Sequence, residues 1–275
     1  MTRRIWVVAD AHIGHVADGR DGGEWLAMAV RDMRRRVRPV DYAVFLGDSS
    51  HRYQAEQFRQ YVRIRDASGI RWWYEIAGNH DYHGVESGDF QRIVRAPLRY
   101  TMVDGNLAWV FFSAERGRAA GLIGEGTAAW LADRLARLQD RNIIVCSHQL
   151  VHGTVEHSDH EERYLHPKGV VARILRRYRV DLWLAGHYHS RPRIKEDSAV
   201  RDGTTFINVA SVSHVYHTAA CNSFVLEART GSRTMRAHCR VHDAGRFAPQ
   251  FEVTIPFRYP FRFGPLPRRA IPRRR

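Results

Sequence analysis

The sequence predicts an α/β fold in which layered β-sheets are flanked by helices. Short apolar runs that suit strands alternate with segments whose apolar residues recur at helical spacing, and the last third of the chain is rich in strand-like runs. The 275 residues, 44% hydrophobic and 26% charged, can bury a substantial core, which excludes disorder, collagen and coiled coil. We expect one domain over residues 1–255, followed by a basic tail over 256–275.

The elements follow in order along the chain. Strands are predicted at 5–9, 42–46, 72–77, 108–112, 142–146 and 182–185. Amphipathic helices are predicted over 26–37, 131–138 and 170–178, the last beginning beside Pro167. Three later strands are expected at 204–209, 222–227 and 233–238. The polar, histidine-rich stretch 151–166 predicts a surface loop, with an extra metal or substrate site as the alternative.

The charge of the chain is strongly positive, with a formal net charge of +14. Seven arginines fall in the last 20 residues, which contain no acid. Such a tail is either a solvated, flexible end or an arm that docks on anions. The remaining excess favours anionic substrates.

The composition also bears on the compartment. No apolar run approaches the roughly 18 residues of a membrane span, and the N-terminus lacks the shape of a cleavable signal. Three cysteines are too few and too sparse for a disulfide framework. We therefore predict a cytoplasmic protein without disulfides.

Chemistry-bearing residues follow five of the predicted strands. They are Asp10-Ala-His12, Gly47-Asp48, Gly78-Asn79-His80-Asp81, Ser147-His148 and Gly186-His187-Tyr188-His189. Because the carboxyl ends of strands in an open α/β sheet share one edge, we expect these side chains to form one site. Alternation along a strand predicts that Asp10 and His12 face the same side, as do His187 and His189.

The donor set predicts a metal centre. Two carboxylates, one amide oxygen and four imidazoles, with no sulfur, suit Mn²⁺, Fe or Zn²⁺ rather than a structural cysteine-type zinc site. Two ions roughly 3.5–4 Å apart need a shared ligand, and Asp48 is our candidate. Each motif alone is weak, since Gly-Asp commonly forms a turn, but five in this order are specific. We expect two divalent ions, Mn²⁺ first, with Fe, Zn²⁺, Ni or Co as alternatives.

The order of these motifs resembles the calcineurin-like metallophosphoesterase superfamily over residues 10–189. The resemblance implies a double β-sandwich flanked by α-helices, a four-layer α/β/β/α arrangement with a dinuclear site at strand ends. It implies that one metal is held by Asp10, His12, Asp48 and His189. The second metal would be held by Asp48, Asn79, His148 and His187, with Asp48 bridging.

The resemblance also implies catalytic residues beside the metals. His80 would face the substrate and donate a proton, with Asp81 orienting it. His15 and His51 lie near the site in sequence and are candidate substrate-binding residues, with exposed loop positions as the alternative.

The chain departs from the family pattern in two places. The family often has a further acid after Gly-Asp, where this chain has Ser49-Ser50-His51. It also often has a Pro-Gly-Ser turn after a late strand, where this chain has Asn208-Val-Ala-Ser211.

These features predict a dinuclear metal-dependent phosphoesterase that hydrolyses phosphate esters by metal-activated hydroxide. We favour a phosphodiesterase acting on nucleotides, cyclic nucleotides or nucleic acid, because the chain is basic and no domain-sized cap interrupts the motifs. The alternative is a phosphomonoesterase or protein phosphatase.

A second alternative is a nucleic-acid-binding protein with incidental activity. Its tail would use arginines for the backbone and aromatic side chains for base stacking, although such tails also pack on their own domain or mediate oligomers. The aromatic residues are Phe257, Tyr259, Phe261 and Phe263.

Overall fold

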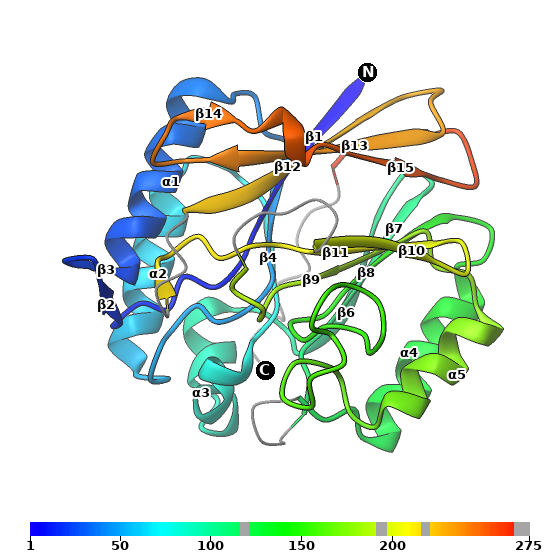
Figure 1. Ribbon diagram of the computed structural model, residues 1–275, viewed down its shortest axis with the longest axis horizontal. Helices are drawn as coiled ribbons and strands as arrows, with labels where there is room; N and C mark the ends of the chain where they lie inside the picture. Colours follow the sequence, from blue (N-terminus) through cyan, green and yellow to red (C-terminus); the bar gives the residue numbers. More distant parts are fainter. Residues whose placement is uncertain (116–120, 191–196, 216–220, 267–275) are drawn as a thin grey trace.

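The computed structural model describes residues 1–115, 121–190, 197–215 and 221–266, which fold into four layers (Figure 1). Two β-sheets pack face to face. Helices α1 (Gly22–Arg36) and α2 (Ala55–Ala67) cover the outer face of one sheet, and α4 (Glu125–Arg137) and α5 (Lys168–Arg177) cover the other. The predicted four-layer α/β/β/α sandwich is confirmed.

The first sheet has the strand order β14-β13-β12-β1-β4-β5, with β15 also paired to β13. Strands β1, β4 and β5 are parallel, whereas β12 runs antiparallel to β1. Their bounds are β1 (Thr2–Val8), β4 (Tyr42–Phe45), β5 (Trp73–Glu75), β12 (Asn222–Arg229), β13 (Thr234–Val241), β14 (Arg246–Phe247) and β15 (Val253–Pro256).

The second sheet has the order β10-β11-β9-β8-β7-β6, with four parallel strands at its centre and antiparallel strands at its edges. Its strands are β6 (Arg99–Asp104), β7 (Leu107–Phe112), β8 (Asn142–Cys146), β9 (Leu182–Ala185), β10 (Ser198–Arg201) and β11 (Thr204–Asn208). A small hairpin, β2 (Val16–Ala17) with β3 (Arg20–Asp21), and the short helix α3 (Tyr82–Glu86) lie outside both sheets.

The core follows from the alternation of side chains along the strands. In β1, Ile5 and Val7 face the second sheet, whereas Trp6 packs under α1 and α2. Across the space between the sheets, Nε1 of Trp109 donates a hydrogen bond to the hydroxyl of Tyr42 at 3.1 Å. The central strands are buried on both faces, which explains why they are continuous apolar runs in the sequence.

Every predicted strand and helix has a counterpart in the structure, with ends shifted by a few residues. Helix α2 and the edge strands β6 and β10 were not predicted. The buried face of α2 includes Gln57 and Arg65, and Arg65 donates a hydrogen bond to Glu75 at 2.7 Å. A helix that buries polar residues with their own partners lacks the apolar period from which helices are predicted.

The beginning of the predicted tail packs on the domain. Phe257 and Phe261 are buried in the core between the sheets. The two side-chain ends of Asn142 bond the backbone of Tyr259 at 2.8 and 2.9 Å. Phe257 and Phe261 are therefore not available for base stacking, because both serve the sandwich core, and for these two residues the alternative of packing on the domain holds. The arginines from 268 onward lie outside the described residues, and the domain boundary at 256 stays a prediction.

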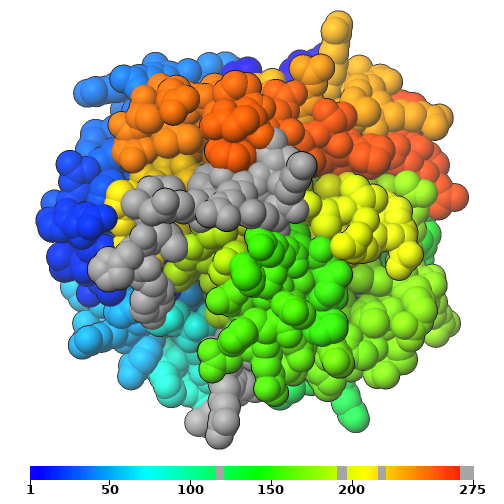
Figure 2. Space-filling model, in the orientation of Figure 1, coloured from blue at the N-terminus to red at the C-terminus, as the bar shows by residue number. Residues whose placement is uncertain are grey.

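Two further expectations can be compared with the structure. The stretch 151–166 holds no named helix or strand, and it reaches the surface on the face shown in Figure 2, in green. All three cysteines are buried, and none forms a disulfide. Among the described residues, no helix combines the length and apolar character needed to cross a bilayer.

Candidate metal centre

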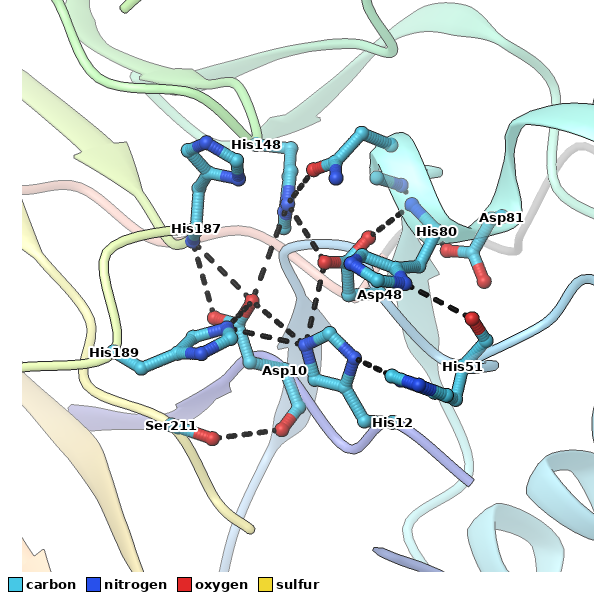
Figure 3. Close-up of polar contacts among 12 residues, drawn as sticks. Asp10, His12, Asp48, His51, His80, Asp81, His148, His187, His189 and Ser211 are labelled. Atoms are coloured by element: carbon cyan, nitrogen blue, oxygen red, sulfur yellow. Dashed lines mark hydrogen bonds and ion pairs between the residues drawn. The ribbon is translucent and has the colours of Figure 1, made fainter. Parts of the chain in front are cut away.

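The five motifs converge at the ends of strands from both sheets (Figure 3). Asp10, Asp48 and Asn79 follow β1, β4 and β5 of the first sheet, whereas His148 and His187 follow β8 and β9 of the second. The expectation of one shared sheet edge is corrected: the site spans two facing edges. Parallel strands in both sheets present their carboxyl ends on the same side of the sandwich, so donors from both reach one place.

The ligand-type residues have an unusual backbone. Asp10, His12, Asp48 and His187 have positive φ values of 58°, 45°, 57° and 68°. Strand alternation therefore does not set their directions, and His187 and His189 join two different groups of donors that share Asp48. Left-handed backbone at non-glycine residues costs on the order of 1 kcal/mol or more each, and such strain concentrates at functional sites.

The first group of donors contains Asp10, His12, Asp48 and His189. Nε2 of His189 lies 3.1 Å from both Oδ1 of Asp10 and Nε2 of His12. Nε2 of His12 lies 3.3 Å from Oδ2 of Asp48. This is the set that the resemblance implies for one metal.

The second group contains Asp48, His148 and His187, with Asn79 beside them. Nε2 of His148 lies 3.2 Å from Oδ2 of Asp48 and 3.1 Å from Oδ1 of Asn79. Nδ1 of His148 donates to the carbonyl of Leu46 at 2.7 Å, which leaves Nε2 facing the other donors. Asp48 belongs to both groups, as a bridging ligand must.

One atom tests whether this donor set fits a cation. Oδ2 of Asp48 is buried and accepts no hydrogen bond from the described residues, although Nε2 of His148 and of His12 lie 3.2 and 3.3 Å away. The other oxygen of Asp48 accepts the backbone N–H of His80 at 2.8 Å. A buried carboxylate oxygen without a partner is costly, and a cation between the two groups would satisfy it. The chemistry of the donors and this orphaned oxygen both fit a divalent metal pair.

The electrostatics of the site favour the protonation states that metal ligands need. Burial alone would raise the pKa of Asp10 and of Asp48, but the surrounding histidines lower both. Burial lowers the pKa of His12 to about 3, and burial together with His148 lowers that of His187 to about 4. These imidazoles are therefore neutral near pH 7 and can offer a lone pair.

His148 is the exception in the metal-free protein. Burial alone would lower its pKa, but Asp48 and Asp10 outweigh burial and raise it to about 9. The site thus keeps one proton between His148 and the two carboxylates. A metal ion that binds Nε2 of His148 displaces that proton, because a ligand imidazole must be neutral.

A family model described as calcineurin-like phosphoesterase matches residues 3–191. The chain belongs to this family. Metallophosphoesterases use divalent metal ions, and the two donor groups that share Asp48 are positioned for such ions. No curated protein sequence matches the chain significantly.

Solved structures share the fold of this family member. A purple acid phosphatase, PPD1 of yellow lupin (Lupinus luteus), is similar with a TM-score of 0.67 and 14% identity over 93% of this chain. The chain spans about half of that protein, 54% of its length. GAP50, the anchor in the inner membrane complex of Plasmodium, is similar with a TM-score of 0.67 and 12% identity, covering 94% of this chain and 90% of its own. TT1561 of Thermus thermophilus has a TM-score of 0.51 and 12% identity, with 90% and 98% covered.

The predicted catalytic and substrate-binding residues lie beside the donors in this metallophosphoesterase. The ring of His80 lies 4.6 Å from that of His12 and 5.0 Å from that of His51, between centroids. His15 is half-buried, with its ring 4.6 Å from that of His51. All four imidazoles therefore lie along one side of the first donor group.

The predicted contact of Asp81 with His80 is corrected. The Asp81 carboxylate is buried and accepts hydrogen bonds from Ser49, Ser50 and the N–H of Gly78, at 2.8–3.1 Å. Nδ1 of His80 instead bonds the carbonyl oxygen of His51 at 2.9 Å. The reason is local: both serines turn their hydrogen-bond donors onto Asp81, which ties the Asp48 loop to the Gly78 turn.

Further residues, not predicted from the sequence, hold the donors in place. The hydroxyls of Ser211 and Ser213 donate to the carbonyl of Asp10 at 2.9 and 2.8 Å. Ser211 belongs to the Asn208-Val-Ala-Ser211 stretch, which loosely matches the Pro-Gly-Ser turn of the family. This match is the sequence signal from which a role for Ser211 at the site could be predicted. A Cβ on Gly78 would lie 2.1 Å from Oδ1 of Asp48. Glycine is therefore required at this position because the Asp48 carboxylate packs directly against the backbone of Gly78, and not only because the chain turns there.

The histidines of 151–166 do not join the donors. Among the described residues, every group able to hold a metal lies at the strand ends. His157 packs near Tyr188, whose ring also contacts Arg163. The loop contributes backbone instead: the carbonyl of Glu162 accepts a hydrogen bond from Nε2 of His187 at 2.8 Å.

Proposed function

We propose that this protein is a metal-dependent phosphodiesterase that acts on nucleotides, cyclic nucleotides or nucleic acid. The observation that carries the proposal is the buried Oδ2 of Asp48, which accepts no hydrogen bond among the described residues and lies between two groups of imidazoles and carboxylates that could hold cations. When bound there, two divalent ions would supply hydroxide near neutral pH and charge neutralisation at the phosphate.

The roles of individual residues follow from this proposal. Asp10, His12, Asp48 and His189 would hold one ion, and Asp48, Asn79, His148 and His187 the other. His80 is partly exposed beside the first group. Because a carbonyl oxygen can only accept, Nδ1 of His80 carries the proton shared with His51. Nε2 would pass a proton to the leaving oxygen from the imidazolium form of the ring, which becomes the neutral Nδ1–H form.

The charge of the surroundings supports a diester over a monoester. A phosphate monoester carries close to two negative charges at neutral pH, because its second pKa is near 6, whereas a diester carries one. Burial and the neighbouring His80 lower the pKa of His51 to about 4, so this ring adds no positive charge near pH 7. His51 therefore offers a substrate no charge that would favour the dianion over the monoanion.

An exposed aromatic side chain beside the site supports a nucleotide substrate. Tyr53 is 48% exposed, and its ring lies 4.5 Å from that of His83. Its backbone N–H bonds the hydroxyl of Ser50, which also contacts the carbonyl of His80. Tyr53 therefore stands next to the proposed proton donor, where a nucleobase could stack on it.

A substrate panel tests the proposal. The purified protein is loaded with Mn²⁺ and assayed on bis(p-nitrophenyl) phosphate and p-nitrophenyl phosphate, then on 2′,3′- and 3′,5′-cyclic nucleotides and on single- and double-stranded DNA and RNA. We expect higher kcat/KM on diesters, with further loading tests in Fe, Zn²⁺, Ni and Co. A preference for the monoester would overturn the proposal and favour a phosphomonoesterase or protein phosphatase.

Nucleic-acid binding as the principal role has its own test. Because Phe257 and Phe261 are core residues, the tail must be truncated from residue 267 rather than from 256. A nucleic-acid arm loses affinity steeply as salt rises, and this truncation would flatten that dependence. Unchanged turnover of a small diester after truncation would assign the last arginines to docking rather than chemistry.

A further inference from the structure

His51 lies in a loop that is held from two directions. Its backbone N–H donates to the carbonyl of Ile13 at 2.9 Å, which ties it to the loop that carries His12. The two preceding residues, Ser49 and Ser50, both donate to the buried carboxylate of Asp81. The position of His51 is therefore set by the same hydrogen bonds that join the Asp48 and Gly78 loops.

The backbone carbonyl of His51 orients His80. Nδ1 of His80 donates to this oxygen at 2.9 Å, and the two rings stack with centroids 5.0 Å apart and planes 20° from parallel. The bond fixes a proton on Nδ1 of His80, and the stacking restrains the ring. Both contacts leave Nε2 as the nitrogen that can exchange a proton with a substrate.

The side chain of His51 contacts His12. Nδ1 of His51 lies 3.4 Å from Nδ1 of His12, while Nε2 of His12 faces Oδ2 of Asp48 at 3.3 Å. If Nε2 of His12 gives its lone pair to a cation, Nδ1 of His12 carries the proton and donates it to His51. Metal-binding histidines are commonly oriented in this way through their other ring nitrogen.

We propose that His51 is a positioning residue that connects the metal centre to the proton donor. Its ring nitrogen holds His12 in the orientation that binds a cation, and its carbonyl and ring face hold His80. The inference rests on the proposed function for the role of His80, but its effect on metal binding does not. It also explains what stands after Gly47-Asp48 in this chain: Ser49 and Ser50 anchor the loop, and His51 makes the two contacts.

Two substitutions separate the contacts. His51→Phe keeps a flat ring to stack on His80 but removes the acceptor for His12. His51→Asn keeps an acceptor close to the position of Nδ1 but removes the ring. His238→Phe is the matched control, because His238 in β13 pairs with Glu252 at 2.9 Å and belongs to neither donor group.

Two readouts are measured on the full chain: the Kd for Mn²⁺ alone, by calorimetric titration of metal-free protein, and kcat on bis(p-nitrophenyl) phosphate at saturating Mn²⁺. We expect His51→Phe to raise the Kd by about tenfold. His51→Asn should keep the Kd within about threefold of wild type but lower kcat by about tenfold, because His80 loses its support. His238→Phe should leave both unchanged.

Three results would overturn the proposal. One is a wild-type Kd in His51→Phe, and another is an equal loss of Mn²⁺ binding in both His51 variants, which would make His51 a direct ligand. Because His51→Phe could fail to fold, ¹⁵N NMR of histidine in the wild-type Zn²⁺ form gives an independent measurement. We expect protons on Nδ1 of both His12 and His80, and a proton on Nε2 alone of His80 is the third contrary result.

A wild type that binds two ions but hydrolyses no ester would reject the proposed function. The effect of His51 on the Kd for Mn²⁺ would still support the His51 proposal.

Discussion

Two buried carboxylates, Asp32 and Asp48, differ in how the protein satisfies them. Asp32 in α1 accepts hydrogen bonds from Nε and Nη2 of Arg240, both at 2.7 Å, and lies 2.8 Å from Nδ1 of His242. Asp48 lies among imidazoles, and its Oδ2 has no hydrogen-bond donor. Both carboxylates have lowered pKa values, but only Asp32 is balanced by an arginine of its own chain.

The comparison distinguishes a carboxylate that stabilises the fold, Asp32, from one that is positioned to bind a ligand, Asp48. A buried ion pair is stable when every lone pair and proton is used, as in the Asp32–Arg240 pair. A buried carboxylate with an open oxygen persists only if the surrounding structure over-determines it or if a ligand completes it. The loops around Asp48 are held by the Asp81 hydrogen bonds, and the two donor groups are positioned for cations that would complete the carboxylate.

The largest expected effect is that of Asp48→Asn. Removing the shared charge should lower metal affinity by at least about 100-fold, since even partners of ligands contribute 10–100-fold. Activity on bis(p-nitrophenyl) phosphate should fall with it. The metal-free variant should unfold at a lower temperature than the wild type at neutral pH, because a carboxylate whose pKa is lowered stabilises the folded state and protonated His148 loses its partner. Metal content by mass spectrometry and thermal unfolding in chelator check both points, and full metal content with full activity would contradict them.

Substitution of His80 by Ala should act on rate rather than on metal. We expect wild-type metal content and a loss of about 10²–10⁴-fold in kcat, greatest for esters with poor leaving groups, because the proton donor is removed. Comparing an alkyl leaving group with p-nitrophenolate measures this dependence. An equal loss for both leaving groups would remove His80 from the role of acid.

Asp32→Asn is the structural counterpart of Asp48→Asn. It leaves Arg240 buried without its countercharge, which should lower the free energy of unfolding by about 3–5 kcal/mol. The folded fraction should still bind metal as the wild type does. Denaturant unfolding measures the free energy of unfolding, and metal analysis measures the metal bound per folded molecule. A loss of metal without a loss of stability would show that Asp32 serves the metal centre rather than the fold.

The pH dependence of stability gives a further test of the role of Asp32, and its expected effect is the smallest of the four. Burial alone would raise the pKa of Asp32, but hydrogen bonds from Arg240 and His242 lower it to about 2. A folded-state pKa below the unfolded value of about 4 stabilises the protein above pH 4, and this contribution is lost as pH falls from about 4 to about 2. The gap in unfolding free energy between wild type and Asp32→Asn should therefore narrow over that range. A constant gap would show that Asp32 titrates normally.

Much of the site could be predicted because its donors follow strands in a recognisable order. The motif residues needed only their types and their places after apolar runs. His51 and Asp81 show the limit. Both were placed near the site, but their partners depend on how three loops meet, and a loop of Ser49 and Ser50 gives no sequence signal for a bond to a carboxylate 31 or 32 positions away.

The fold shows the same division. Continuous apolar runs predicted β4, β8 and β9. Helix α2 was not predicted from the sequence, because its buried face includes Arg65, which pairs with Glu75, and so its apolar residues do not recur at helical spacing. The aromatic residues after Pro256 looked like a stacking arm, yet Phe257 and Phe261 fill the sandwich. Aromatic side chains interleaved with arginine have the same local pattern in both settings, and only packing against the sheets decides between them.

By itself, the sequence determined the layered α/β architecture, because apolar periodicity is a short-range feature. The order of its motifs predicted the candidate donors and, through the family resemblance, Asp48 as the shared carboxylate. The tertiary structure alone decided that the donors come from two sheets, that Asp48 keeps one oxygen open, and that His51 rather than Asp81 contacts His80. Those outcomes depend on atoms brought within about 3 Å by the packing of distant segments, and no local pattern encodes such distances.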